Sequence, residues 1–241
     1  MTIISADKLV FQTPDAVNWL VPERLIAGGL NLLAGEVAAG KTFLALDLAL
    51  GAAVRAEAWG GLFIPTGKVL YYCLDSSATT IGHRLKNLCR GYAINPPRSL
   101  HFDFELHDFS EPAQIKTLKG LIQSEGYHLV IIDALAHYLP GMDENTVASI
   151  GPVLTRLRRL TDDTRSTILL IHHFNKSGHT RQSISQGMRI RGSSDIFAAV
   201  DTALSLVMKG PVRILRQVKN RNGREAAPLT GAERRVWFMW G

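Results

Sequence analysis

An eight-residue stretch near the amino end constrains this chain more than any other feature. Residues 35–42 have the sequence GEVAAGKT, which fits the pattern G-x-x-x-x-G-K-[ST]. Such a loop wraps its backbone N–H groups around the phosphates of a nucleoside triphosphate, its lysine reaches the β- and γ-phosphates, and its last hydroxyl ligates Mg²⁺. The amino end of the following helix adds a favourable field for the anion. The motif therefore predicts a site for ATP and Mg²⁺, with contacts from Gly35, Glu36, Val37, Ala38, Ala39, Gly40, Lys41, Thr42 and Phe43.

Both flanks of the motif agree with a phosphate-binding loop. Residues 30–34 (LNLLA) are apolar enough for a buried strand, and residues 43–50 (FLALDLAL) are rich in strong helix formers. The alternative is a glycine- and alanine-rich turn that only resembles the motif. The strand before the loop and the helix after it weigh against that alternative.

Composition sets the broad class of the protein. The chain has 241 residues with 46% apolar content, which is enough for one substantial core. Its two cysteines have no partners at metal-binding spacing, and we expect no disulfide framework. The first residues carry no basic segment followed by an apolar run, and charges interrupt the apolar stretch at 30–54. We therefore expect a reduced, cytoplasmic protein with a single domain over residues 1–241, in which residues 1–20 form an amino-terminal extension or strand and residues 21–241 the ATPase core.

The rest of the chain alternates between strand and helix signals. We expect strands at 68–74, 99–104, 128–133 and 167–173, and helices at 79–90, 112–124 and 146–160. The last quarter changes character and predicts strands at 202–207, 212–221 and 236–240, joined by short turns. This order predicts an α/β fold with a mostly parallel twisted sheet flanked by helices and with antiparallel strands at the carboxyl end.

Two acidic residues follow apolar strands. Asp133 closes the strand at 128–133, and we predict that it is the second anchor of Mg²⁺, because the carboxyl ends of parallel strands gather beside the loop. Its alternative role is to cap the next helix. Asp75 ends the strand after the helix of the loop, and we predict that it orients the attacking water.

These motifs carry a resemblance to a known family. The loop, Tyr71–Asp75 and Ile131–Asp133 come in the order of the RecA-like P-loop NTPase fold, and the chain is most similar to hexameric helicases of the RepA plasmid type and the DnaB replicative type. The resemblance spans about residues 19–223. Further stretches that match it are residues 80–85, 171–173, 191–194 and 219–223. One departure is that these families generally use Glu as the catalytic carboxylate, where this chain has Asp75. The shorter side chain requires compensation by the backbone or implies slow turnover.

The resemblance implies further roles. His173 would be the sensor of the γ-phosphate, although His172 and His173 could also be ordinary residues at the end of a strand. Lys219 and Arg221 would be fingers that reach the γ-phosphate of a neighbouring subunit, which implies a ring, most simply a hexamer. The alternative is an exposed basic hairpin.

Charge suggests a polyanionic partner. The 27 basic and 21 acidic residues give a net charge of +6, and residues 174–191 contain cations but no carboxylate. By the resemblance to RecA-like motors, this segment occupies the place of a central DNA-binding loop, and we expect phosphate contacts from Lys176, Arg181 and Arg189. A second loop at 137–145 is less suited because it contains Asp143 and Glu144.

The sequence therefore favours an ATP-hydrolysing, ring-forming helicase that acts on single-stranded DNA in replication. The main alternative is a RecA-like DNA-dependent ATPase that works as a switch, loader or recombination factor without unwinding. A non-catalytic binding module is a third possibility, motivated by the short Asp75. A GTPase is disfavoured because Asn175-Lys176-Ser177-Gly178 lacks the acid of a guanine-reading motif.

Overall fold

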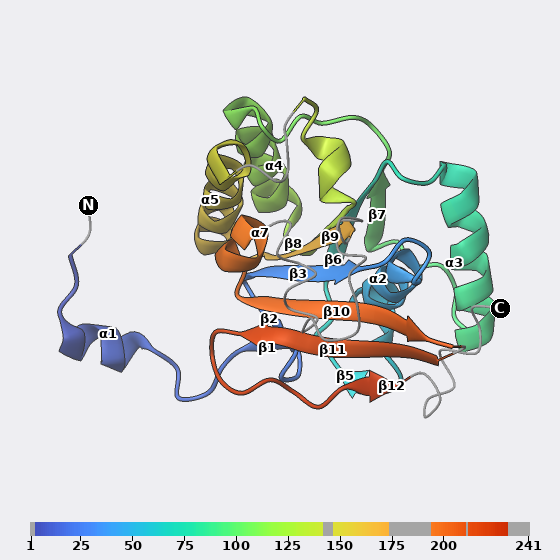
Figure 1. Ribbon diagram of the computed structural model, residues 1–241, viewed down its shortest axis with the longest axis horizontal. Coiled ribbons are helices and arrows are strands. Elements are labelled where there is room, and N and C mark those ends of the chain that lie inside the picture. Colours follow the sequence, from blue (N-terminus) through green and yellow to red (C-terminus); the bar gives the residue numbers. More distant parts are fainter. Residues whose placement is uncertain (1–2, 142–146, 174–193, 211, 231–241) are drawn as a thin grey trace.

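The fold is built on one large sheet (Figure 1). The computed structural model describes residues 3–141, 147–173, 194–210 and 212–230. Within these residues the sheet has eight strands in the order β12-β11-β10-β3-β9-β8-β6-β7. They are β3 (Leu30–Gly35), β6 (Lys68–Cys73), β7 (Leu100–Asp103), β8 (Tyr127–Asp133), β9 (Thr167–His173), β10 (Thr202–Lys209), β11 (Val212–Asn220) and β12 (Leu229–Thr230). The strands from β10 to β7 are parallel, while β11 runs antiparallel to β10 and to β12.

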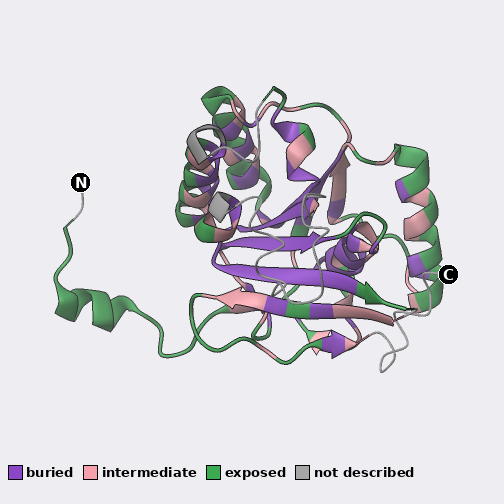
Figure 2. Cartoon of the chain, in the orientation of Figure 1, coloured by how far each residue is buried: buried purple, intermediate pink, exposed green. Residues whose placement is uncertain are grey.

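Helices cover both faces of this sheet (Figure 1). They are α2 (Lys41–Leu50) and α3 (Ala78–Tyr92) on one face, and α4 (Pro112–Glu125), α5 (Val147–Thr164) and α7 (Ser194–Ala199) on the other. Because side chains alternate along a strand, Leu33 packs in the core on the α2 side while Leu32 packs on the α5 side. The central strands are therefore buried on both faces, as Figure 2 shows, and the predicted α/β class is confirmed.

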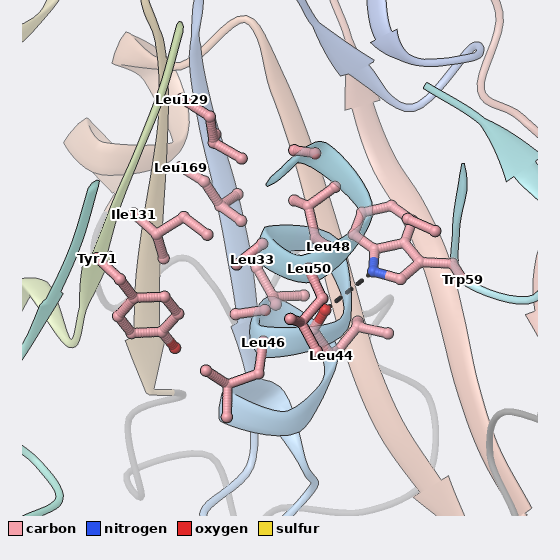
Figure 3. Packing of buried hydrophobic residues seen from close by; sticks show 14 of the residues in the cluster. Leu33, Leu44, Leu46, Leu48, Leu50, Trp59, Tyr71, Leu129, Ile131 and Leu169 are labelled. Carbon is pink, nitrogen blue, oxygen red and sulfur yellow. Dashed lines mark hydrogen bonds between the residues drawn. The ribbon is translucent and has the colours of Figure 1, made fainter. Parts of the chain in front are cut away.

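The helix after the loop is anchored by packing and by a buried polar network. Leu44, Leu46, Leu48 and Leu50 of α2 are all buried, and Trp59 donates its indole N–H to the carbonyl of Leu44 over 3.0 Å (Figure 3). The buried carboxylate of Asp47 on the same helix accepts hydrogen bonds from the backbone N–H of Trp59, from Arg55 and from the hydroxyl of Tyr92. A satisfied buried network of this kind fixes the helix relative to its surroundings. The loop at the amino end of α2 consequently rests on a rigid support.

Most expected elements are present, with ends shifted by a few residues. The predicted strand at 236–240 lies outside the described residues. The short elements that we did not predict are α1 (Ala6–Gln12), β1 (Trp19–Val21), β2 (Leu25–Ile26), the π-helical turn η1 (Gly51–Arg55), β4 (Glu57–Ala58), β5 (Leu62–Phe63), the 3₁₀ helix η2 (Leu135–Tyr138), α7 and β12. Such short pieces carry too little periodicity to be recognised.

The amino-terminal residues form an arm beside the folded body (Figure 1). Helix α1 has no buried residue, and the side chains of Leu9, Val10 and Phe11 are exposed. The body begins at β1, where Leu20 is buried. Among the described residues, no helix combines the length and the apolar character that a membrane span requires.

Candidate nucleotide-binding site

The phosphate-loop motif lies between β3 and α2, as expected. Gly40 precedes the helix with φ of 97°, a conformation that suits glycine. Gly35 ends β3 so close to β10 that an added Cβ would lie 2.5 Å from the carbonyl oxygen of Leu206. Residues 36–38 are exposed at the tip of the loop. The two glycines of the motif are therefore required for different reasons, one by the turn and the other by strand packing.

Lys41 is folded into the loop. Its ammonium group donates to the carbonyl oxygens of Gly35 at 3.1 Å and Glu36 at 2.7 Å, and the residue is buried. Burial lowers the pKa of Lys41 to about 8, although Asp133, Asp75 and Glu36 favour the charged form. The side chain is still mainly a cation at pH 7, so it can meet phosphate oxygens at the loop.

Asp133 lies at the end of β8 beside the loop. It is 2% exposed, it accepts a hydrogen bond from the hydroxyl of Tyr71 over 2.7 Å, and its carboxyl also interacts with the side chain of Thr42. Burial raises the pKa of the Asp133 carboxyl, because the hydroxyl partners and the more distant Lys41 do not offset the loss of water.

This arrangement suits Mg²⁺. A buried carboxylate and a threonine hydroxyl are the oxygen donors that the ion prefers, and the charge of the ion would compensate for the burial of Asp133. In the described part of the chain, no three His, Cys, Asp or Glu side chains form a metal cluster. The remaining ligands would be nucleotide phosphates and water, which is the usual arrangement for Mg²⁺ in nucleotide sites.

Asp75 lies beyond its strand rather than at its end. Strand β6 ends at Cys73, which corrects the expectation that Asp75 terminates it. The carboxylate is partly exposed, and the Asp75 Oδ1 lies 3.2 Å from Nε2 of His137 in η2. It also lies close enough to Lys41 and His173 to affect the pKa of both side chains. Asp75 thus lies near the loop lysine, and its role in orienting the attacking water stays a prediction.

The two histidines of β9 face opposite sides of the sheet. Leu169 and Ile171 pack in the core on the α2 side, and the alternation of the strand places His173 on that same face. Burial lowers the pKa of His173, and the positive charge of Lys41 adds to the effect. His172 is buried, and burial lowers its pKa to about 4. The charge of Lys41 lowers the pKa of both histidines, while His173 lies on the face of the loop helix, and its role as a sensor stays a prediction.

Lys219 and Arg221 converge on the carboxyl end of α7. The ammonium group of Lys219 donates to the carbonyl oxygens of Phe197 at 2.5 Å and Ala198 at 3.0 Å, and Arg221 donates to that of Ala198. Strand β11 ends at Asn220, so Arg221 lies just beyond the strand to which we had assigned it. Burial lowers the pKa of Lys219 to about 8, with a further contribution from Arg221.

These two cations lie far from the loop of their own chain. Lys219 pairs with Ala203, whereas Gly35 pairs with Leu206 on the same strand β10. The offset of three residue steps, from Ala203 to Leu206, corresponds to roughly 10 Å along the strand. Lys219 and Arg221 therefore lie toward the end of the sheet at which β3 begins. The loop lies at the end of the sheet at which β3 finishes.

Three residues near the site escaped the sequence analysis. Tyr71 donates to Asp133, Arg213 on β11 donates to the loop carbonyl of Ala39 over 3.2 Å, and His137 contacts Asp75. Each contact joins segments that only the order of the strands brings together, so no local signal could have found them. The expected DNA contacts Lys176, Arg181 and Arg189 lie outside the described residues. So do positions 142–146 of the second candidate loop, whose first residues belong to η2.

A comparison with protein families agrees with this geometry. A family model described as an AAA domain matches residues 4–179, which is more than half of the chain. The matched region contains the phosphate loop, Asp75, Asp133 and His173, and it ends before Lys219 and Arg221. The chain therefore belongs to this family of AAA domains, and it is a P-loop ATPase.

Proposed function

We propose that this protein is an ATP-hydrolysing, ring-forming motor on single-stranded DNA, similar to the hexameric helicases of the RepA and DnaB types. The observation that carries the proposal is the position of Lys219 and Arg221 on the sheet. They lie toward the opposite end of the strands from the loop of their own chain, which supports action on a triphosphate that another subunit binds. In a head-to-tail arrangement, the side of one copy that carries the cations meets the side of the next copy that carries the loop. Such an arrangement closes into a ring when the rotation between successive copies is suitable.

Each residue of the site has its own role in the proposed reaction. The backbone of residues 35–42 and Lys41 bind the phosphates, and Thr42 and Asp133 hold Mg²⁺, which would offset the charge on the β- and γ-phosphate oxygens. Asp75 orients the attacking water and accepts its proton, and His173 donates a hydrogen bond toward the γ-phosphate. Lys219 and Arg221 of the neighbouring copy supply positive charge to the transition state.

The positive charge of the chain supports a contact with DNA. We assign Lys176, Arg181 and Arg189 to phosphate contacts with single-stranded DNA, in keeping with the acid-free sequence around them and the net charge of +6. We also propose that residues 1–241 form one domain with a short amino-terminal extension and that the protein works in the cytoplasm.

Two measurements on the same material test the function. Light scattering with and without ATP and single-stranded DNA should reveal a ring-sized oligomer, and a forked duplex should be unwound when ATP is hydrolysed. A strictly monomeric protein that hydrolyses ATP at full speed would contradict the ring. Hydrolysis stimulated by single-stranded DNA without strand displacement would favour a switch or loader instead of a helicase.

A further inference from the structure

The partner of Asp75 is an unexplained feature of the site. His137 lies in η2, four residues after Asp133, and its Nε2 atom is 3.2 Å from Oδ1 of Asp75. Both side chains are a little less than half exposed. Asp75 and His137 also each affect the pKa of His173, which places all three side chains in one group near Lys41. The contact therefore lies within the candidate catalytic group and not at a remote surface.

The fold holds His137 firmly in this position. Its neighbours Leu135 and Tyr138 are completely buried, and the backbone N–H of His137 donates to the carbonyl oxygen of Ala134 over 3.1 Å. The carbonyl oxygen of Tyr138 accepts a hydrogen bond from the backbone N–H of Phe109 over 2.9 Å. Because the backbone of the turn is held on both sides of His137, its side chain projects from a fixed point toward Asp75.

The turn that carries Asp75 is held at both ends. The backbone N–H of Leu74 donates to the carbonyl oxygen of Asp133, and Arg84 donates to the hydroxyl of Ser76 over 3.3 Å. Ser77 then caps α3 by accepting a hydrogen bond from the N–H of Thr80. These bonds fix the backbone around Asp75 but leave its carboxylate free to rotate. Nε2 of His137 lies 3.2 Å from Oδ1 of Asp75, close enough to orient the carboxylate.

We propose that His137 is a positioning residue for Asp75, and that the pair performs the task for which similar ATPases use a glutamate. This inference rests on the proposed role of Asp75 in orienting the attacking water. An aspartate is shorter than a glutamate by one methylene, about 1.5 Å of reach. It therefore tolerates less freedom if its oxygen is to remain at hydrogen-bonding distance from the water. His137 donates its Nε2–H to one carboxylate oxygen and so fixes the direction of the other.

The test compares His137 variants, alone and in an Asp75→Glu background, with a control variant of the 241-residue chain, all with single-stranded DNA present. His137→Ala should lower kcat by roughly ten- to a hundredfold, while KM and the affinity for a fluorescent ATP analogue change by less than about twofold. His137→Gln, which keeps a donor at similar reach, should retain most of the rate. In an Asp75→Glu background, the loss caused by His137→Ala should shrink to within about threefold, because the longer carboxylate no longer needs the support. His107→Ala is the matched control, since it removes a similar contact to Asp103 (2.9 Å) outside the group around Lys41.

The outcomes separate this inference from the function on which it rests. If Asp75→Asn abolishes hydrolysis while His137→Ala leaves kcat unchanged, the positioning role of His137 is overturned and the role of Asp75 stands. If Asp75→Asn hydrolyses ATP at the normal rate, the catalytic assignment of Asp75 itself fails. An equal loss of kcat in His137→Ala and in the His107→Ala control would also overturn the inference, because it would indicate a general effect on the fold.

Discussion

The carboxylate of Asp133 shows how much single residues near the loop depend on their neighbours. It is buried at the end of β8, and it is held by the hydroxyl of Tyr71 on the adjacent strand β6. The hydroxyl donates to one oxygen and so restricts the rotation of the carboxylate. Outer partners of this kind commonly tune the affinity of a site for its metal. Tyr71 is therefore expected to matter for Mg²⁺ although it is not itself a predicted ligand.

Replacing Tyr71 by Phe tests this dependence. We expect the Mg²⁺ concentration that half-saturates nucleotide binding to rise several-fold, because Asp133 loses the bond that orients it. We also expect a loss of about 1 kcal/mol in the free energy of unfolding, the usual magnitude for one buried hydrogen bond. Titration of a fluorescent nucleotide at varied Mg²⁺ and denaturant unfolding measure the two effects.

The neighbouring tyrosine provides the control. Tyr72 points to the opposite face of β6, where it packs against Phe109 and Tyr138. Tyr72→Phe should leave the Mg²⁺ dependence unchanged. An equal shift in both variants would contradict a specific role for the Tyr71 hydroxyl.

At the scale of elements, β9 is the strand that links the loop to Asp133. It lies between β3 and β8, and it ends with His172 and His173. His172 is 3% exposed, and burial lowers its pKa to about 4 from an ordinary value of 6.5. Between pH 4 and pH 6.5, His172 is therefore mostly protonated in the unfolded chain and mostly neutral in the folded chain. The stabilising effect of neutral His172 is complete above pH 6.5 and is lost as the pH falls toward 4.

The variant His172→Gln tests this linkage because glutamine does not titrate. We expect the wild type to lose roughly 2 kcal/mol of stability between pH 7 and pH 4 through this group, and we expect the variant to lose less over the same range. Denaturant unfolding at several pH values measures the difference. His83→Gln on the exposed part of α3 should behave like the wild type. A variant with the same slope as the wild type between pH 7 and pH 4 would contradict the linkage.

In the molecule as a whole, the loop lies toward one end of the strands of the sheet. Lys219 and Arg221 lie toward the other end. The amino-terminal arm also leaves the body close to β11, since Gln217 donates to the carbonyl oxygens of Glu23 and Arg24. Figure 1 shows the arm and the start of β10 on the same side of the molecule, away from the end of β3. One side of the chain thus carries the two cations, and the other carries the candidate nucleotide site.

Mixing two inactive variants tests whether the cations act on a neighbour. Lys41→Ala cannot bind the phosphates productively, and Arg221→Ala lacks a finger, so each should be nearly inactive alone. In a mixed ring, a subunit with Arg221→Ala keeps an intact loop and can receive Arg221 from a Lys41→Ala neighbour. Random mixing should restore up to about a quarter of the wild-type ATPase rate.

The double variant Lys41→Ala/Arg221→Ala is the control for mixing. It can enter a ring but supplies neither a loop nor a finger, so it should restore nothing to Arg221→Ala. Recovery with the double variant, or no recovery with Lys41→Ala in verified mixed rings, would contradict action between subunits.

Features that depend on neighbouring residues in the chain could be predicted from the sequence. The glycines at 35 and 40, Lys41 and Thr42 identify the loop because its conformation and chemistry are local. The long strands and helices follow from periodicity, which is why the α/β class could be predicted. Asp133 could also be proposed as a site residue from the sequence, because an acidic residue that closes an apolar strand is a pattern within one segment.

Contacts between distant residues depend on how the strands are arranged in the folded chain. Tyr71 reaches Asp133, and His137 reaches Asp75, because β6 and β8 are adjacent and in one particular register. Lys219 lies away from the loop because β11 reverses direction beside β10. Strand order and register follow from the packing of the entire core, so no single segment of the sequence contains them.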